Sequence, residues 1–366
     1  MSVSNPRPSE EWRKEPGSRL RGSRPLDQLK IQAPCVVAVP GSGFRLFYTA
    51  IGPAKPFSVC QGYILSAFSD DGLTFHPEPG IRLPPTPEVP HRALRILAPT
   101  INRTADGRWR MYFESRGAAD RPTVIGSAVS DDMLNWEHEP GIRLEGFRGL
   151  GGPRHVCLPD GRSRLYCFAV ESCTEDTAEG IPDDGDSGTG QTRHSVISAV
   201  SDDGVQFEFE AGYRLRDRRF EYDSAGITAA DVIPPRSEQS QWTMYFSAWQ
   251  NVPQGTHVPP HPSQDPDAAN NGLSQDFAAA SIASDLAGFR SRIFTARSAD
   301  GLNWDRGACV VAGAGYDSDE FDAVHAEDMS LIRLDNGTYR MYYAACDSQG
   351  NWTIGSATND RSDRVH

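Results

Sequence analysis

A short stretch of sequence occurs five times in this chain, and it restricts the fold more than any other feature. Its clearest copy spans residues 125–144 and reads IGSAVSDDMLNWEHEPGIRL. Related copies start at Ile64, Val196 and Ile293, and a shortened fifth copy starts at Ile354. Internal repetition of this kind is typical of propellers, solenoids and repeat arrays. The content of each unit decides among these architectures.

Each unit carries the pattern of four antiparallel strands. An apolar run ends in a glycine turn, as at residues 106–107, and an aromatic strand follows, as at 109–113. The repeated stretch then alternates apolar and small residues, turns at Ser-Asp-Asp-Gly, and resumes with an aromatic residue such as Trp136, which predicts a hairpin. Asp and Gly in these hairpins are turn formers, so we interpret them as structural. Repeated four-stranded units predict an all-β fold, a five-bladed β-propeller.

The last unit lacks a fourth strand, and a matching sequence lies at the other end of the chain. Residues 12–20 read WRKEPGSRL, close to FHPEPGIRL at 75–83 and WEHEPGIRL at 136–144. We therefore predict that residues 11–20 complete the last blade and close the ring, which removes exposed sheet edges. The predicted organisation is a disordered tail over residues 1–10 and a single domain over 11–363, with blades at about 27–83, 91–146, 149–216, 220–313, and 316–363 joined by 11–20.

Composition excludes several classes of function. The 366 residues carry a net charge of −13, which argues against binding to phosphate backbones. No apolar run suits a membrane span and the N-terminus lacks the apolar core of a secretory signal, so we expect a cytoplasmic protein without nucleic-acid or membrane partners. Seven scattered cysteines without a CxxC pair predict reduced packing residues rather than disulfides or a zinc site.

The beginnings of the inner strands are expected to meet at the axis of the ring. In the sequence alignment of the units, Asp231 and Asp328 stand there opposite Pro34, Pro99 and Pro153. Two carboxylates at one axial position should repel, so one pKa should rise unless a cation neutralises them; the alternative is that each caps a backbone amide. Charged groups at the mouth of such a funnel favour a functional site. The candidate catalytic residues are Asp231, Asp328, Glu327, His155 and His325, and the candidate substrate-binding residues are Arg154, Glu114, Glu171, Trp249 and Asp223.

Two long connections are predicted on the same face. Residues 171–190 are acidic and glycine-rich, and residues 248–290 include a predicted short helix at 273–287. Connections of this length are usually functional lids or disordered, and we interpret the second as a lid, with a disordered insertion or an oligomer contact as the alternative. His155 and His325 with Glu327 and Asp328 could ligate a divalent metal, but their spacing matches no established motif, so no cofactor is expected.

The repeat resembles the five-bladed propeller glycosidases of the invertase, arabinanase/xylosidase and mannoside-phosphorylase type. The resemblance rests on FEYDSAGI at 220–227, on aromatic strands such as RMYY at 340–343 and on the IGSA and Ser-Asp-Asp-Gly segments, and it covers residues 11–363. It implies an enzyme whose inner-strand carboxylates act as acid and as base or nucleophile on a glycoside. Two positions depart from the family pattern, because Ala33-Pro34 replaces Asp-Pro and residues 97–100, LAPT, replace Trp-Ala-Pro-Asp.

Three functions remain open at the level of sequence. The first is a glycoside- or sugar-active, hydrolase-like enzyme that uses the remaining carboxylates. The second is a small-molecule tailoring or cyclising enzyme on the same fold, using His155 or His325 with Asp231 and Asp328. The third is a propeller that binds a carbohydrate or small molecule without turnover. A screen with aryl glycosides separates the first function from the other two.

Overall fold

The computed structural model describes residues 12–28, 30–51, 61–117, 121–172, 192–217, 221–223, 226–236, 240–251, 289–315 and 318–359, and the structural statements below concern these residues. They form an all-β protein with two short 3₁₀ turns, η2 (Pro90–Arg92) and η4 (Glu221–Asp223). In these ranges no helix is long and apolar enough to cross a membrane. The predicted tail at 1–10, the predicted helix at 273–287 and most of the two long connections lie outside the described residues.

The strands pair in chain order into antiparallel groups, which we name A to E. Group A contains β3 (Lys30–Val39), β4 (Gly43–Ile51), β5 (Gly62–Ser69) and β6 (His76–Pro77). Group B contains β7 (Arg95–Arg103), β8 (Trp109–Arg116), β9 (Val124–Ser130) and β10 (Glu137–His138). Group C contains β11 (Gly149–Cys157), β12 (Ser163–Ser172), β13 (Thr192–Ser201), β14 (Glu208–Phe209) and β15 (Leu215–Arg216).

The remaining strands form two further groups. Group D contains β16 (Gly226–Ile233), β17 (Trp242–Asn251), β18 (Phe289–Ser298) and β19 (Asp305–Val311). Group E contains β20 (His325–Arg333), β21 (Tyr339–Cys346) and β22 (Trp352–Thr358), joined by β1 (Arg13–Lys14) and β2 (Leu20–Arg21). Single parallel bridges link β5 to β7 and β18 to β20.

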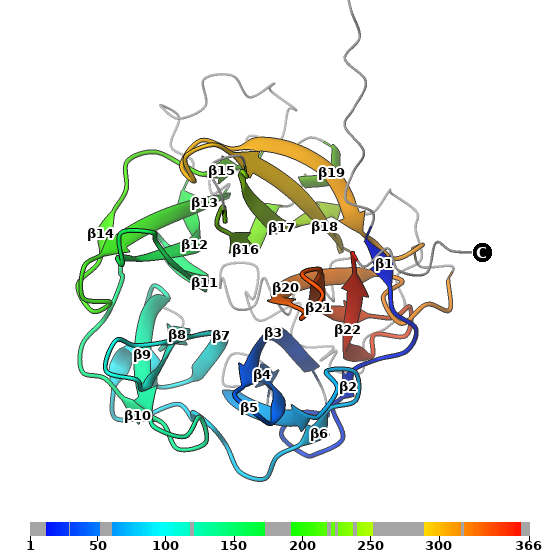
Figure 1. Cartoon of the computed structure of the whole chain (residues 1–366), viewed down its shortest axis with the longest axis horizontal. Coiled ribbons are helices and arrows are strands. Elements are labelled where there is room, and N and C mark those ends of the chain that lie inside the picture. Colours follow the sequence, from blue (N-terminus) through cyan, green and yellow to red (C-terminus); the bar gives the residue numbers. More distant parts are fainter. Residues whose placement is uncertain are drawn as a thin grey trace, which may run out of the picture.

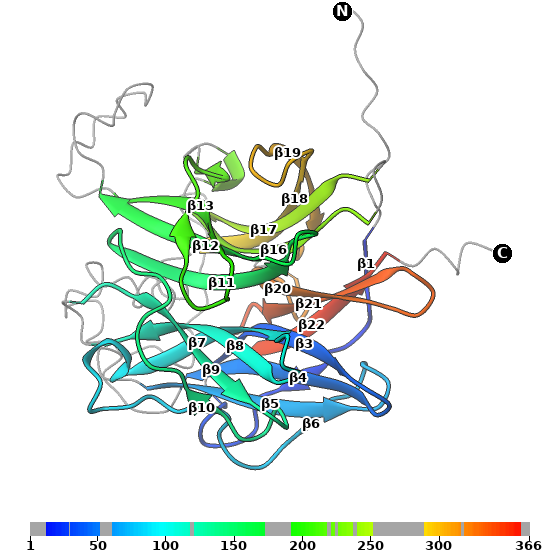
Figure 2. The ribbon, with the colours of Figure 1, turned by 60° about the vertical axis from the view of Figure 1, so that its left-hand side comes forward.

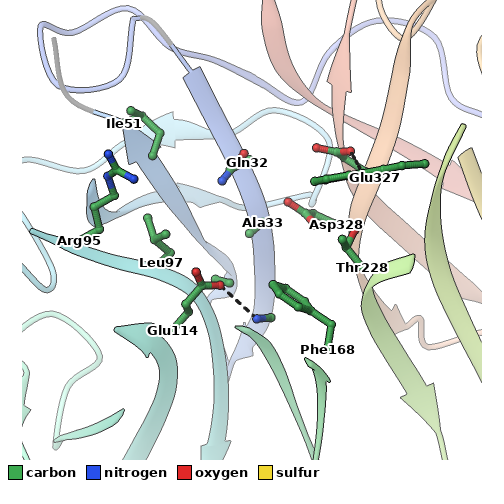
Figure 3. A pocket seen from close by; sticks show the side chains of 13 residues that line it. Gln32, Ala33, Ile51, Arg95, Leu97, Glu114, Phe168, Thr228, Glu327 and Asp328 are labelled. Atoms are coloured by element: carbon green, nitrogen blue, oxygen red, sulfur yellow. Dashed lines mark hydrogen bonds between the residues drawn. The ribbon is translucent and has the colours of Figure 1, made fainter. Parts of the chain in front are cut away.

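The groups are arranged around a common centre, with the first strand of each group innermost (Figure 1). Around this centre, β3 contacts β7 and β20, and β11 contacts β7 and β16. Burial is greatest in the first half of these strands, as the patterns of β3 and β20 show. The first halves of the inner strands surround a pocket, which Figure 3 shows from close by.

The N-terminal strands pair with the last strand of the chain, as the sequence predicts. Arg13 and Lys14 pair with Thr358 and Ala357 of β22, and β2 pairs with the same strand further along. Figure 2 shows β1 running beside β22. Between β1 and β2, Glu15 accepts hydrogen bonds from Arg340 Nε at 2.9 Å and Nη2 at 3.0 Å. The first described strands of the chain are therefore joined to the last one by both backbone and side-chain contacts.

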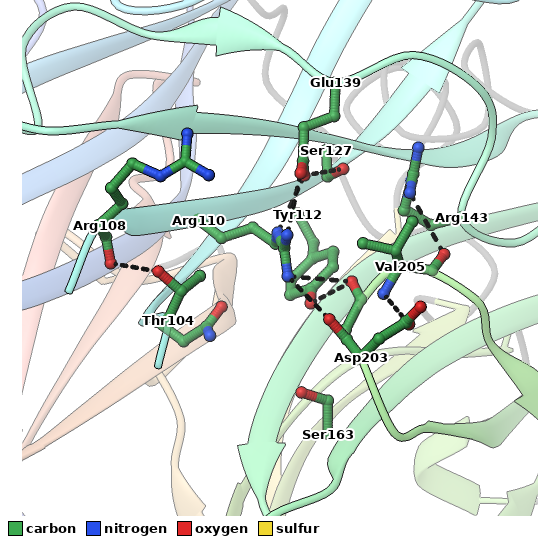
Figure 4. Close-up of polar contacts among 12 residues, drawn as sticks. Thr104, Arg108, Arg110, Tyr112, Ser127, Glu139, Arg143, Ser163, Asp203 and Val205 are labelled. Carbon is green, nitrogen blue, oxygen red and sulfur yellow. Dashed lines mark hydrogen bonds and ion pairs between the residues drawn. The ribbon is translucent and has the colours of Figure 1, made fainter. Parts of the chain in front are cut away.

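One contact motif recurs in the outer part of four groups. In group B, Arg110 donates from Nε and Nη2 to Glu139 at 2.9 Å, and Ser127 Oγ donates to the same carboxylate at 2.7 Å (Figure 4). The neighbouring Tyr112 hydroxyl donates to the carbonyl of Gly204 in group C at 2.8 Å. These contacts tie the strands within group B and join group B to group C. The equivalent Arg–Glu ion pairs are Arg45–Glu78, Arg164–Glu210 and Arg340–Glu15.

The Ser-Asp-Asp-Gly segments are turns, which confirms their structural interpretation. Ser69 Oγ accepts the N–H of Gly72 at 2.9 Å, and Asp71 Oδ1 accepts the N–H of Leu73 at 2.7 Å. Backbone N–H donation to the carboxylate lowers the pKa of Asp71. The turns follow the third strands, at the end of each group opposite the pocket, so these carboxylates take no part in it. Equivalent backbone bonds occur at Asp132, Asp203 and Asp300.

Candidate active site

Each inner strand is interrupted by one residue in the left-handed backbone region. Beside each of these residues the pairing with the second strand changes register. Left-handed φ is easy for glycine, tolerated by aspartate and costly for most other side chains. The position therefore carries small residues in four groups and a carboxylate in one. The left-handed residues are Ala33 (φ 48°), Ala98 (48°), Gly152 (53°), Ala229 (32°) and Asp328 (51°).

This backbone feature corrects the alignment of the inner strands. Asp328 is equivalent to Ala229, whereas Asp231 lies two residues further along β16. The prolines of β3, β7 and β11 follow the left-handed residue, so their counterparts are Ala230 and Met329. The prediction that Asp231 and Asp328 share one axial position is wrong. The repeated element is the left-handed residue, and two groups form it without the proline used in the alignment.

Three carboxyl groups line the axial pocket. Glu114 of β8 lies on one side, and Glu327 and Asp328 of β20 lie on the other (Figure 3). Arg95 of β7 and Trp249 of β17 also line the pocket. A concave site with few polar groups on an otherwise apolar wall is the usual form of a small-molecule site. The rest of the lining is Gln32, Ala33, Ile51, Leu97, Ala98, Gly152, Phe168 and Thr228.

Glu114 occupies a position that other groups use to bind a backbone amide. Its Oε2 accepts the N–H of Gly152, the left-handed residue of group C, at 3.3 Å. At the equivalent positions, Thr49 Oγ1 accepts the N–H of Ala98 at 2.8 Å and Ser247 Oγ accepts that of Asp328 at 2.9 Å. A short side chain with a hydroxyl group is therefore enough to bind the backbone amide at this position. Glu114 adds a carboxyl group, and burial raises its pKa to about 7.

Asp328 places its carboxylate in the pocket from a left-handed residue. Burial raises the pKa of Asp328, while Arg154, Lys30 and the backbone N–H of Ala33 act in the opposite direction. Part of its side chain remains exposed, unlike that of the neighbouring Glu327. Asp328 is therefore the more accessible of the two β20 carboxylates that line the pocket.

Glu327 is fixed by an aromatic donor. Trp249 Nε1 donates to Glu327 Oε2 at 2.8 Å, and both side chains are buried. His325 Nδ1 lies 4.0 Å from the same carboxylate oxygen and 3.0 Å from Ser291 Oγ. The His325 ring stacks on Trp352 with centroids 5.3 Å apart. Trp249 and Glu327 line the pocket. His325 does not line it but lies close to the Glu327 carboxylate.

Asp231 and Arg154 lie beyond the pocket along the axis. Asp231 accepts the N–H of Leu331 at 2.7 Å, a contact between groups D and E. Thr100 and Ser330 make the same contact from equivalent positions, with the N–H groups of His155 at 3.2 Å and Val36 at 3.1 Å. Asp231 therefore caps backbone amides, which is the alternative role that the sequence analysis considered for it.

The Arg154 guanidinium is buried on the axis and binds backbone carbonyls. Nη1 donates to Pro99 O at 3.0 Å and to Pro153 O at 3.3 Å. Nη2 donates to Met329 O at 2.9 Å and to Pro34 O at 3.2 Å. Four inner strands thus meet at one cation, which does not line the pocket.

The three other predicted site residues make contacts outside the pocket. His155 stacks on Tyr112 at 5.6 Å and contacts Ser163 Oγ at 2.9 Å, and burial lowers its pKa to about 4. Glu171 accepts from Tyr213 Oη at 2.6 Å and pairs with Arg216 at 3.2 Å. Asp223 pairs with Arg306 at 2.7 Å, with both side chains buried. None of the three lines the axial pocket.

The sequence analysis missed two of the three basic residues at the beginnings of the inner strands, Lys30 and Arg95; the third, His325, was among the predicted site residues. Lys30, Arg95 and His325 stand three residues before the left-handed residue in groups A, B and E, and glycine stands there in groups C and D. Arg95 lines the pocket, and the Lys30 ammonium lies 4.0 Å from the centroid of the Trp352 ring. All three side chains are buried. The signal in the sequence was a basic residue directly before an apolar strand. An alignment based on the left-handed residue would have placed Lys30, Arg95 and His325 at one common position.

The residues considered as metal ligands are His155, His325, Glu327 and Asp328. No group of three or more His, Cys, Asp and Glu side chains in the described part of the chain is arranged to hold a metal ion. His155 and His325 belong to separate contact sets, with Ser163 and Ser291 respectively. They are therefore not assembled with Glu327 and Asp328 into one ligand set.

Comparisons with known proteins identify the fold. No protein-family model matches the chain, and no curated protein matches its sequence. Among solved structures, one described as a glycoside hydrolase has a TM-score of 0.64 at 15% identity, covering 95% of this chain and 92% of its own. A second solved structure has a TM-score of 0.64 at 12% identity, covering 99% of this chain and 97% of its own. It is described with the GH130 family of mannoside phosphorylases, which contains glycoside hydrolases that target β-1,2 mannosidic linkages in Candida mannan.

An endo-arabinase from Bacteroides thetaiotaomicron is also similar, with a TM-score of 0.54 at 12% identity over 91% of this chain and 95% of that one. The fold of this chain is that of the propeller-type glycosidases, which confirms the resemblance seen in the sequence. At these identities the likeness concerns the fold.

Proposed function

We propose that this protein is a sugar-active, hydrolase-like enzyme that works in the axial pocket. The observation that carries the proposal is the meeting of Glu114, Glu327 and Asp328 in one pocket. The fold shared with glycoside hydrolases supports it. We propose further that groups A to E are the blades of a five-bladed propeller, with β1 and β2 completing the last blade.

Glu114 is the proposed general acid. A buried carboxyl group with a pKa of about 7 is partly protonated at neutral pH, so it can give a proton to the leaving-group oxygen of a glycoside. The hydrogen bond from the N–H of Gly152 to Oε2 orients the Glu114 carboxyl group and leaves Oε1 available to carry the proton. Burial thus supplies the property that a catalytic acid needs.

Asp328 is the proposed base or nucleophile. Burial raises the pKa of Asp328, which makes it a stronger base, while Arg154, Lys30 and the N–H of Ala33 act in the opposite direction. As Glu114 protonates the glycosidic oxygen and the bond to the anomeric carbon breaks, Asp328 either attacks that carbon or takes a proton from the water that attacks it. Glu327, held by Trp249, is the proposed positioning carboxylate beside it.

A panel of aryl glycosides that includes β-mannosides and arabinosides tests the proposal. We expect hydrolysis of at least one member, and a fall in kcat/KM of roughly 10²- to 10⁴-fold in Glu114→Gln and Asp328→Asn. Glu171→Gln is the matched control, since this carboxylate contacts Tyr213 and Arg216 outside the pocket. NMR of the first-formed anomer distinguishes direct attack by Asp328, with retention, from attack by water, with inversion. Full activity in both pocket variants would refute the assignment.

Binding without turnover is the competing function, and one observation favours it. The expected carboxylates of the first two inner strands are absent, because Ala33 and Thr100 stand at those positions. Equilibrium binding of a sugar with no product, and with binding lost in Asp328→Asn, would establish this alternative. The tailoring or cyclising enzyme has less support, because His155 and Asp231 do not reach the pocket.

A further inference from the structure

A second hollow lies on the pocket face of the protein, at the rim of group B. Its walls come from η2, from the beginning of β9 and from the segment that leads into β11. Both β9 and β11 begin on the face where the axial pocket opens, since alternate strands of an antiparallel group run in the same direction. We call it the rim groove. Its volume is about 530 Å3, and the lining used below is His91, Arg121, Ile142, Glu145 and Phe147.

Phe147 is strained and exposed at once. Its φ is 59°, a value that bulky side chains rarely adopt, and it follows Gly146 at φ 136°. Phe147 is 39% exposed, and its ring makes an edge-on contact at 5.6 Å with Phe209, itself 45% exposed. Burial therefore does little to offset the strain. Strained residues that packing does not explain occur preferentially at binding sites.

The groove surrounds this ring with polar groups of differing chemistry. Arg121 supplies a guanidinium, Glu145 a carboxylate and His91 an imidazole. Burial and the nearby Arg92 and Arg121 lower the pKa of His91, against the opposing effect of Glu145, which favours the neutral ring that can both donate and accept. An apolar ring beside paired donors and acceptors matches a sugar unit, which has a C–H face and several hydroxyl groups.

We propose that the rim groove is a second sugar-binding site, in which Phe147 stacks on one unit of an oligosaccharide. The choice of a sugar as the ligand class rests on the proposed function of the axial pocket. A protein partner is less favoured, because the exposed large apolar residues in the described ranges are only Ile81, Phe147, Phe209 and Tyr213, while three ionisable groups line the groove.

The test is binding of a panel of linear hexasaccharides built from hexoses, pentoses and uronic acids, measured with Asp328→Asn to block turnover. We expect at least one to bind, and Phe147→Ala in that background to weaken binding by about tenfold or more. Arg121→Gln should weaken it as well, which keeps the test valid if replacing Phe147 disturbs the fold. Ile81→Ala is the matched control, because Ile81 is similarly exposed, at 37%, but lies outside the groove.

The outcomes separate this site from the axial one. Loss of binding in Phe147→Ala with unchanged hydrolysis of a small aryl glycoside supports the groove and leaves the axial proposal intact. Sugar binding in the groove without hydrolysis of any aryl glycoside supports the groove and counts against the axial enzyme. Absence of binding across the panel, or binding unchanged in both groove variants, overturns the proposal. A change of oligomeric state in Phe147→Ala without any sugar binding would instead make the groove a protein interface.

Discussion

Arg154→Met should destabilise the whole protein, because this side chain joins four inner strands at the axis. The guanidinium is part of a side chain that is 4% exposed and donates to the carbonyls of Pro34, Pro99, Pro153 and Met329. Methionine fills a similar volume but donates no hydrogen bond. The substitution therefore leaves backbone carbonyls from several groups without this partner.

The magnitude follows from the two shorter bonds. Hydrogen bonds of a charged donor contribute roughly 1.5–3 kcal/mol each, so the contacts at 2.9 and 3.0 Å give about 3–6 kcal/mol. Removing a buried charge also relieves some desolvation, which lowers the net effect. We expect the free energy of unfolding to fall by about 3 kcal/mol, a large part of the usual 5–15 kcal/mol.

Urea denaturation followed by fluorescence measures this change. Arg154→Lys should give an intermediate loss, because an ammonium keeps the charge but not the planar fork. Arg162→Met is the surface control: this arginine pairs with Asp160 at 2.9 Å and is 45% exposed, so its loss should change stability by less than about 0.5 kcal/mol. A loss below about 1 kcal/mol in Arg154→Met would refute the role of the axial cation.

Three further predictions concern the ends of the chain and the pocket. Deletion of residues 1–20 removes β1 and the Glu15 carboxylate bound by Arg340, so the melting temperature should fall by several degrees; an unchanged value would contradict closure by this segment. Because burial raises the pKa of Glu114 from 4.5 to about 7, the folded state favours the protonated form, and wild type should lose stability relative to Glu114→Gln as pH rises through that interval, by up to about 3 kcal/mol. Denaturation at the two ends of the interval measures this, and a pH-independent difference would disprove it. Trp249→Phe removes the donor to Glu327 and should lower kcat/KM about tenfold, with some fall in melting temperature because a buried donor and ring volume are lost; wild-type kinetics in the folded variant would exclude a role for that bond.

The fold was predictable because its determinants repeat in the sequence. Glu15, Glu78 and Glu139 occupy matching positions in the Glu-Pro-Gly segments, and each binds the arginine of an aromatic strand. The pairing of the N-terminal segment with β22 follows from that match. Periodic features of this kind allow strand order and strand neighbours to be predicted. A wrong strand assignment would have to fit every copy of the repeat, which makes it easy to detect.

The pocket was harder to predict, because its geometry depends on single residues. Proline was used to align the inner strands, yet the structure shows a left-handed residue as the repeated element, formed by Ala229 and Asp328 in groups without that proline. A shift of one position moves a side chain to the other face of a strand. The alignment therefore placed Asp231 at the site, although it caps an amide beyond the pocket, while Arg95 was overlooked.

The proposed functional residues are those that depart from the repeat. At the amide-binding position of the second strand, groups A and D use Thr49 and Ser247, and group B uses Glu114. At the left-handed position, Ala33 and Ala98 serve where group E has Asp328. Glu114→Thr and Asp328→Ala would restore the residues that the repeat itself uses, so both variants should unfold at or above the wild-type temperature. Activity should nevertheless be lost, because Glu114 and Asp328 are the proposed acid and base. Stability should be kept, because neither carboxyl group is needed for the fold. Strong destabilisation in both variants, measured by thermal denaturation, would instead assign these two side chains to the structure of the ring.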